Sequence, residues 1–420
     1  MMGDDAPEPA FVFTDMAGRI CTIPQKSSGS FSGSVLPEWC RPQHSDLVFH
    51  PDAAASFGAT AELAFGTITH ARHGSPAWFD SRAMLGRVTG LLADQGIELR
   101  IGLEAEFYIF EKAEVETGLS HSRVRLESVD MVLRDAADPQ PYRVGYPRMQ
   151  FRPPPFDRHA KLRRRIVQQL AARGVGVTHH DHEAGPGQQE IALAPQPPVA
   201  ACDALSVLKL TTHEMADHDG LTASFMPLPL SWCPGSGLHV HISAGRAGQD
   251  MLYTGGRRSD EGRRILRTLA AAIPSLSAFC TPSPSGLRRL WMMRQGLGGR
   301  PVAGYADRRA LIRLIHAGGG DVGRIELRFP DASGDPYAML TVILASLFLR
   351  APEPMPVPDY APVLAMRPLL DQAMDALGPV LEAAGAHPRF APAYRAFRCR
   401  ELDALAMSAS VAEMQLHLGC

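Results

Sequence analysis

Residues 179–190 read His179-His180-Asp181-His182-Glu183-Ala184-Gly185-Pro186-Gly187-Gln188-Gln189-Glu190. The Gly-Pro-Gly segment between the two glutamates favours a tight turn, which can bring Glu183 and Glu190 back to one point. A pair of carboxylates suits a hard divalent cation. A loop of this composition is also common on a solvated surface. The interpretation as a metal site therefore depends on other segments of the chain.

Composition indicates a globular protein. The chain has 420 residues, 45% of them hydrophobic and 20% charged, with a formal net charge of -2, so neither nucleic acid nor a membrane is expected as a partner. Seven cysteines without a Cys-x-x-Cys pair favour reduced thiols and a cytoplasmic location. The longest apolar run, residues 337–349, is shorter than the ~20 residues of a membrane span. It predicts a buried helix with Asp335 as N-cap and Pro336 in its first turn.

The N-terminal part is expected to form a small domain. Residues 11–24 predict two short strands around a turn, and loops are expected from residue 27 through residue 52. Helical spacing follows, with Asp80 as N-cap and Gly96 at the end. We therefore place a domain boundary at residue 97, with the domains at 1–97 and 98–420.

Three segments, at residues 97–109, 238–243 and 324–329, alternate apolar and polar side chains. Alternation predicts strands whose polar residues share one face. Taken alone, the first polar row could be a solvated sheet edge, the second could hold structural histidines, and the third could be a surface ion-pair ladder. Together with residues 179–190, however, they favour a site for metal and anions. The polar side chains are those of Glu98, Arg100, Glu104, Glu106, His239, His241, Ser243, Arg324, Glu326 and Arg328.

The collected polar residues predict phosphoryl chemistry. Five carboxylates and one imidazole would repel one another without cations, and oxygen-rich ligation selects Mg²⁺ or Mn²⁺ over zinc. Nearby arginines then require anionic substrate groups, and a polyphosphate with a carboxylate meets that requirement. The six candidate ligands are Glu104, Glu106, Glu183, Glu190, His239 and Glu326, and the arginines are Arg289, Arg308, Arg313, Arg324 and Arg328.

From about residue 11 to residue 350, the chain resembles the glutamine synthetase family. The resemblance implies an α+β fold, with a small N-terminal β-grasp-like domain and a catalytic domain whose curved antiparallel half-barrel sheet is backed by helices. It also implies rings, a decamer to a dodecamer, in which a neighbour's N-terminal domain completes each active site. The matching motifs are Glu-x-Glu-Phe at 104–107, the stretch at 182–190, Gly-Ser-Gly-x-His-x-His at 235–241, Arg-x-x-x-x-Arg at 308–313 and Arg-x-Glu-x-Arg-Phe-Pro-Asp at 324–331.

The resemblance implies a role for each matching residue. In the family, ATP phosphorylates a side-chain carboxylate, usually that of glutamate, and an amine then displaces phosphate to give an amide. Catalytic roles fall on Arg308, Glu326 and Arg328. One metal site falls on Glu106, Glu183 and Glu190 and the other on Glu104, His239 and Glu326, ATP contacts on His241, Ser243, Arg313 and Arg324, and substrate contacts on Gly235, Arg289 and Arg328.

The chain departs from the family where ammonium binds. Ser32 stands in place of an aspartate, and the flap glutamate is missing, since no Asp or Glu occurs between Glu261 and Asp307. The flap region offers Trp291 and a Gly-rich turn at 296–299 instead. An unpaired ammonium forfeits about 1–3 kcal/mol. We therefore expect a γ-glutamyl-amide ligase that uses an amine other than ammonia, with Ser32 and Trp291 in the amine pocket.

Other departures concern the acid and leave two alternatives open. Pro234 replaces an asparagine whose amide lies near the amino-acid site, so the acid is described only as glutamate-like. Asp335 replaces an asparagine and preserves N-cap chemistry. A catalytically silent structural or regulatory ring is one alternative, favoured by the lost ammonium acceptors and opposed by the complete metal and arginine sets. The other is an ordinary ammonia-dependent glutamine synthetase.

Overall fold

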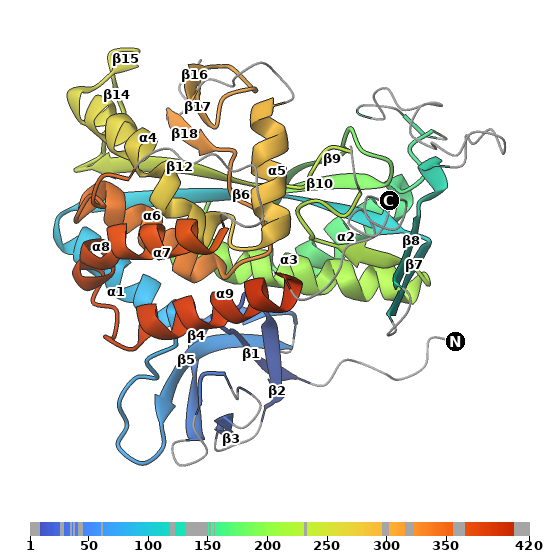
Figure 1. Cartoon of the computed structure of the whole chain (residues 1–420), viewed down its shortest axis with the longest axis horizontal. Coiled ribbons are helices and arrows are strands. Elements are labelled where there is room, and N and C mark those ends of the chain that lie inside the picture. The colour runs from blue at the N-terminus through green and yellow to red at the C-terminus, as the bar shows by residue number, and fades with distance from the viewer. Residues whose placement is uncertain are drawn as a thin grey trace, which may run out of the picture.

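Two β-sheets, one small and one large, organise the chain in this computed structural model (Figure 1). The small sheet lies at one end of the molecule, and the large sheet with its helices makes up the rest. The structure describes residues 9–25, 29–33, 36, 38–40, 45–59, 62–117, 122–131, 150, 153, 154, 156–230, 233–295, 302–315, 323–355 and 366–406.

The small sheet has the strand order β2-β1-β5-β4-β3, with β1 parallel to β5 and the other neighbours antiparallel. Gly18, at φ +87°, makes the predicted turn between the first two strands. The expectation of loops through residue 52 was wrong, because Leu47 and Phe49 are buried and pair with β5 ahead of a bulge after Pro51. The strands are β1 (Ala10–Thr14), β2 (Ile20–Pro24), β3 (Ser30–Ser32), β4 (Asp46–Phe57) and β5 (Leu63–His70).

The large sheet is the curved half-barrel that was predicted. Its order is β16-β17-β18-β12-β6-β10-β9, antiparallel except between β16 and β17, and β11 and β13 pair beside this path. The strands are β6 (Ile97–Phe110), β9 (Val177–His182), β10 (Gln188–Leu193), β11 (Thr222–Ser224), β12 (Leu238–Arg246), β13 (Gln249–Asp250), β16 (Ala303–Tyr305), β17 (Ile312–Ile315) and β18 (Arg324–Leu327). Two hairpins stand apart, β7 (Lys112–Thr117) with β8 (Ser122–Glu127), and β14 (Tyr253–Thr254) with β15 (Arg257–Arg258).

Helices cover one face of the large sheet (Figure 1). Two predicted caps are confirmed: Asp80 accepts a hydrogen bond from Ala83 N, and Asp335 from Tyr337 N, both at 2.9 Å. The helices are α1 (Ser81–Asp94), α2 (Ala160–Ala172), α3 (Pro198–His218), α4 (Asp260–Cys280), α5 (Pro284–Gln295), α6 (Pro336–Phe348), α7 (Met366–Ala376), α8 (Gly378–Ala383), α9 (Phe390–Ala406) and the short 3-10 helix η3 (Val129–Met131).

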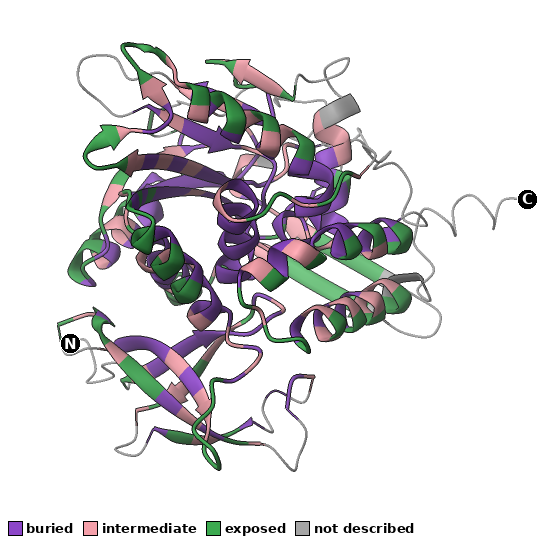
Figure 2. Cartoon of the chain, turned by 90° about the vertical axis from the view of Figure 1, so that its left-hand side faces the viewer, coloured by how far each residue is buried: buried purple, intermediate pink, exposed green. Residues whose placement is uncertain are grey.

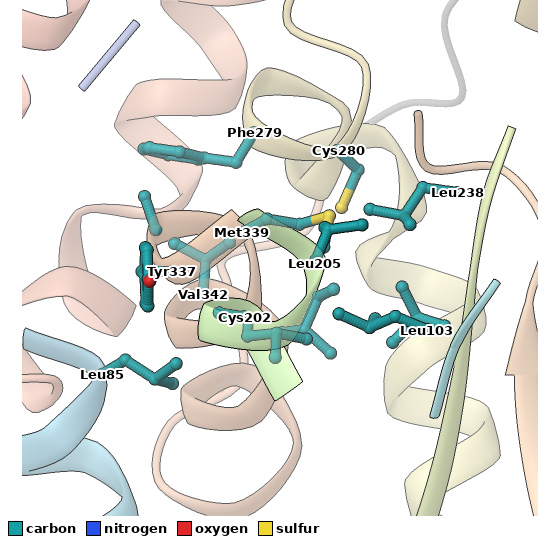
Figure 3. Packing of buried hydrophobic residues seen from close by; sticks show 14 of the residues in the cluster. Leu85, Leu103, Cys202, Leu205, Leu238, Phe279, Cys280, Tyr337, Met339 and Val342 are labelled. Carbon is teal, nitrogen blue, oxygen red and sulfur yellow. The ribbon is translucent and has the colours of Figure 1, made fainter. Parts of the chain in front are cut away.

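The hydrophobic core lies between the large sheet and these helices (Figures 2 and 3). Leu103 of β6 and Leu238 of β12 face Leu205 of α3 and Met339 of α6. Helix α6 is buried along almost its whole length, as its apolar sequence predicted. No helix among the described residues is long and apolar enough to cross a membrane. Helix α1 contacts strands of both sheets, so its contacts do not assign it to one domain or the other. The domain boundary at residue 97 therefore remains a prediction.

Candidate active site

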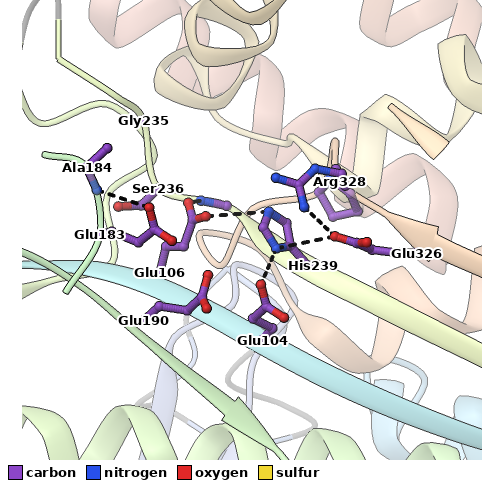
Figure 4. Close-up of polar contacts among 12 residues, drawn as sticks. Glu104, Glu106, Glu183, Ala184, Glu190, Gly235, Ser236, His239, Glu326 and Arg328 are labelled. Atoms are coloured by element: carbon purple, nitrogen blue, oxygen red, sulfur yellow. Dashed lines mark hydrogen bonds and ion pairs between the residues drawn. The ribbon is translucent and has the colours of Figure 1, made fainter. Parts of the chain in front are cut away.

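Strand register brings the predicted polar residues together on the face of the large sheet opposite the core. His239 of β12 lies opposite Glu104 of β6, and Glu106 lies opposite Glu190 of β10. Residues two apart on a strand point to the same side, so these four side chains share one face. Glu183 arrives beside them from the turn between β9 and β10, and Figure 4 shows the resulting cluster.

Two groups of side chains in this cluster have the spacing of a metal site. Candidate ligand atoms of Glu106, Glu183 and Glu190 lie within 4.8 Å of one another, and so do those of Glu104, Glu190 and His239. The first group equals the set that the family resemblance implies. The second contains Glu190 where the resemblance implies Glu326. Two adjacent groups of this kind can hold two cations, although the assignment of each ligand remains a prediction.

Glu326 lies at the edge of the cluster and is held by arginines. Its Oε1 is 3.7 Å from His239 Nδ1 and accepts a hydrogen bond from Arg328, while its Oε2 accepts from Arg313 Nη1 at 2.9 Å. Burial acts to raise the pKa of Glu326, but His239 and Arg328 outweigh it and lower the pKa. Glu326 is therefore an anion whose charge two arginines already balance.

The shifted pKa values of the other carboxylates indicate that the cluster needs cations. Burial acts to raise the pKa of Glu104, but hydrogen bonds from His239 Nδ1 at 2.6 Å and His241 Nε2 at 3.3 Å bring it well below its usual range. Burial, and then the charge of Glu104, raises the pKa of Glu190 to about 11. Burial and Glu106 raise that of Glu183. Carboxylate oxygens with one imidazole fit Mg²⁺ or Mn²⁺, which would replace the shared protons.

A cleft of about 890 Å³ opens beside the cluster. Glu104 lines it together with His241, Ser243 and Arg324, three of the four residues predicted to contact ATP. Arg324 Nε donates to His241 Nδ1 at 3.3 Å. The fourth, Arg313, does not line the cleft, because its guanidinium is bound to Glu326. The cleft is large enough for a nucleotide.

Arg289 is buried beneath the predicted substrate loop. It donates to the carbonyl oxygens of Phe329 at 3.0 Å, Pro330 at 3.2 Å and Arg328 at 3.2 Å. A side chain at Gly235 would place a Cβ 2.6 Å from Pro227 O and 2.7 Å from Arg289 Cγ, so only glycine fits there. Main-chain carbonyls thus occupy Nη1 and Nη2 of Arg289, while its buried Nε has no partner among the described residues, and its role on a substrate carboxylate remains a prediction.

Three predicted residues lie outside the cluster. Ser32 is on β3, the edge strand at the end of the small sheet farthest from β6 (Figure 1). Trp291 is half-buried on α5, and Arg308 is exposed on the turn between β16 and β17. The roles of these residues therefore remain predictions, and the Gly-rich turn at 296–299 lies outside the described residues.

Two contacts at the cluster were missed from the sequence. His179 Nε2 lies 3.3 Å from Glu190 Oε1 and 3.8 Å from Glu104 Oε2. Alternation along β9 could have placed His179 on the face of the site. Gln150 Nε2 donates to Glu183 Oε1 at 3.2 Å. No periodic pattern connects Gln150 with residue 183, so the sequence carried no signal for this contact.

Comparisons with known proteins agree with the site. The family profile described as the catalytic domain of glutamine synthetase matches residues 79–349. The glutamine synthetase of Azorhizobium caulinodans is 27% identical over 331 residues, 75% of this chain and 70% of that protein. That of Streptomyces coelicolor is 30% identical over 329 residues, with the same coverage of 75% and 70%.

Solved structures show the same fold. The cryo-EM structure of Plasmodium falciparum glutamine synthetase has a TM-score of 0.80 at 18% identity, covering 99% of this chain and 97% of that one. A structure described as apo GmaS without ligand has a TM-score of 0.74 at 22% identity, with coverage of 99% and 97%. With the catalytic-domain profile over most of the sequence and the carboxylate cluster in place, this chain belongs to the glutamine synthetase family and is an ATP-dependent carbon–nitrogen ligase.

Proposed function

We propose that this ligase joins a glutamate-like acid to an amine other than ammonia, giving a γ-glutamyl amide. The observation that carries the choice of amine is the loss of both acidic ammonium acceptors. Ser32 stands where the family has an aspartate, and residues 262–306 contain no Asp or Glu to supply the flap carboxylate. A substituted amine gains binding energy from apolar contacts, and it depends less on acidic acceptors than an ammonium ion does.

In the proposed reaction, the cleft binds the nucleotide and the carboxylate cluster binds the metal ions. In this proposal His241, Ser243 and Arg324 hold the nucleotide along the cleft, with its terminal phosphate at the carboxylates. Mg²⁺ or Mn²⁺ bound by Glu104, Glu106, Glu183, Glu190 and His239 would neutralise the phosphate oxygens. The side-chain carboxylate of the acid attacks the terminal phosphorus and releases ADP. The amine then displaces phosphate from the acyl phosphate as the amide bond forms.

Exclusion of water is part of what the chain supplies. The acyl phosphate would be lost to hydrolysis if bulk water reached it. His239 and Glu326 are 3% and 1% exposed, so the floor of the site is shielded by the sheet itself. In this proposal Arg328, which is bound to Glu326, also binds an anionic group of the substrate.

An amine panel tests the proposal. Phosphate release is measured with ATP, Mg²⁺ and glutamate over ammonia, alkylamines, ethanolamine and polyamines, and the amide product is identified by mass spectrometry. We expect at least one substituted amine to exceed ammonia in kcat/KM. Ammonia as the best acceptor would refute the proposal and support an ordinary glutamine synthetase.

A second measurement separates the enzyme from a silent relative. Isothermal titration with Mn²⁺ and a non-hydrolysable ATP analogue should show metal-dependent nucleotide binding. Hydroxylamine with glutamate should give the hydroxamate, which reports activation of the acid independently of the natural amine. A protein that neither binds the nucleotide nor forms the hydroxamate is a structural or regulatory relative.

A further inference from the structure

The turn that carries Glu183 and Glu190 has a second, buried side. On the site-facing side both glutamates approach the cluster. On the other side, the imidazole of His182 and the backbone of Gly187 point into the protein, toward Asp130 of η3. Asp130 and His182 were given no role from the sequence, and neither is among the candidate ligands.

Asp130 holds the turn at two points with a single oxygen. Its Oδ2 accepts hydrogen bonds from His182 Nε2 at 2.9 Å and from Gly187 N at 2.8 Å. Both side chains of the Asp130–His182 pair are 1% exposed. A buried carboxylate loses its hydration, so this arrangement is maintained only because two donors replace the water. Although burial opposes it, His182 lowers the pKa of Asp130.

His182 also contacts the backbone of Glu183. The Nδ1 atom of His182 lies 2.6 Å from the carbonyl oxygen of Glu183, while the amide of Glu183 donates to Gln188 O at 2.8 Å. The backbone amide of Glu183 is therefore held by Gln188, and its carbonyl oxygen lies against the imidazole of His182. The Glu183 side chain is held as well, because Ala184 N donates to its Oε2 at 3.0 Å and Gln150 Nε2 donates to its Oε1 at 3.2 Å.

Gly187 shows how closely the turn is pressed against this anchor. Its φ is +73°, a conformation that favours glycine. A Cβ there would collide with Ser128 Oγ and lie 2.5 Å from Ile109 O. Ile109 N also donates to Gly187 O at 2.9 Å. Strand β6 and the segment leading into η3 thus pack closely against the middle of the turn.

We propose that Asp130 and His182 are positioning residues that hold Glu183 in place for metal binding. The inference rests on the proposed function, because it assumes that the carboxylate cluster binds a divalent cation. Residues behind a ligand fix its orientation, and losing them typically weakens metal binding 10–100-fold. A merely structural pair would change the stability of the protein without changing metal affinity once the chain is folded.

The test compares Asp130→Ala, Asp130→Asn and the control Asp219→Ala. Asp219 is a surface carboxylate paired with Arg165 at 2.7 Å, far from the turn in sequence. Mn²⁺ affinity is measured by isothermal titration on protein shown to be folded by circular dichroism. We expect Asp130→Ala to raise the Kd for Mn²⁺ by about 10–100-fold. Asp130→Asn keeps an oxygen that can accept both bonds and should raise it less, and Asp219→Ala should leave it unchanged.

Each outcome distinguishes this inference from the proposed function. If the wild-type protein binds no Mn²⁺, the proposed function fails. If it binds Mn²⁺ and Asp130→Ala has a Kd within twofold of the wild-type value, only the positioning role is overturned. Should Asp130→Ala not fold, His182→Gln carries the test, with the same twofold limit. Saturating Mn²⁺ should also restore most of kcat in the variants, since the ligands themselves remain.

Discussion

Glu326 combines a buried position with two cationic partners, and this makes its role testable at the level of one residue. Its side chain is 1% exposed and bound to Arg313 and Arg328. The same carboxylate lies 3.7 Å from His239. Removing it would therefore change the cluster on one side and leave two arginines without their partner on the other. Loss of one partner of a buried ion pair typically costs about 3–5 kcal/mol.

Glu326→Ala should abolish phosphorylation of the acid. We expect turnover to fall by at least about 10²–10³-fold, the usual effect of removing a group that stabilises charge at the reacting centre. ADP formation measured with glutamate and the best amine checks this, with thermal unfolding as a test of integrity. Glu353→Ala, at an exposed glutamate paired with Arg350, is the control. Undiminished turnover would remove Glu326 from the catalytic set.

At the scale of the element, helix α6 shows how one residue fixes the start of a buried helix. Asp335 Oδ1 accepts from Tyr337 N at 2.9 Å, and Pro336 occupies the first turn. Complete burial raises the pKa of this carboxyl to about 7, from an ordinary value of 3.8. The carboxyl of this N-cap residue is therefore costly to ionise inside the protein.

Asp335→Asn should change how stability depends on pH. An acid whose pKa is raised by folding stabilises the native state below its unfolded pKa and loses that contribution as pH rises to its folded pKa. The contribution of Asp335 to the free energy of unfolding should therefore fall between pH 4 and pH 7, by an amount of the order of 2–4 kcal/mol. Asparagine caps as well as aspartate but cannot ionise. Urea unfolding at pH 5 and pH 8 should show a smaller fall in the variant, and equal falls would contradict the prediction.

The elements predictable from sequence are those with strict periodicity. Alternation predicted β6, β12 and β18, and apolar length with an N-cap predicted α6. Strand β4 was missed because Pro51 and several polar residues mask its alternation, and because its pairing with β5 shifts at a bulge. The β7–β8 hairpin was also missed, since its outward-facing Val115 and Val124 give no buried face to detect.

From the sequence, only those parts of the site could be predicted that follow strand alternation or a turn motif. The candidate ligands lie on alternating strands or in one glycine-rich turn, so their residue types and spacing revealed them. Register then decided which ones meet, and it brought Glu190 rather than Glu326 into the group with Glu104 and His239. The contacts of Asp130 with His182 and of Gln150 with Glu183 join segments with no shared period. They became visible only in the folded chain.

At the scale of the whole molecule, Ser32 lies on a different sheet from the carboxylate cluster of the same chain. Strand β3 lies at the outer edge of the small sheet (Figure 1), and the cluster lies on the large sheet (Figure 4). A role for Ser32 in the amine pocket therefore requires a second chain. We propose the ring of ten to twelve chains that the family resemblance implies, and light scattering after gel filtration measures its size.

Ser32→Asp should shift preference toward ammonia, and it should act on a neighbouring chain. Subunits carrying both Ser32→Asp and Glu326→Ala are inactive, but they still present the new carboxylate. When wild-type subunits are reassembled with an excess of these inactive subunits, most active sites have a neighbour that carries the Ser32→Asp substitution, and the ratio of ammonia to substituted-amine turnover should rise severalfold. Glu326→Ala subunits without the aspartate are the control. An unchanged ratio in rings shown to be mixed would place Ser32 outside the partner's pocket.

Glu190 belongs to both triads of candidate ligands. A carboxylate that belongs to both groups could bridge two ions, and the ions would then not load independently. Burial and Glu104 raise the pKa of Glu190, so the first ion would take the place of a proton there, and the second would meet a carboxylate that is already ionised. By linkage, each ion raises the affinity of the other. Mn²⁺ titration should therefore be cooperative, and Glu190→Gln should abolish the cooperativity and weaken the binding of both ions.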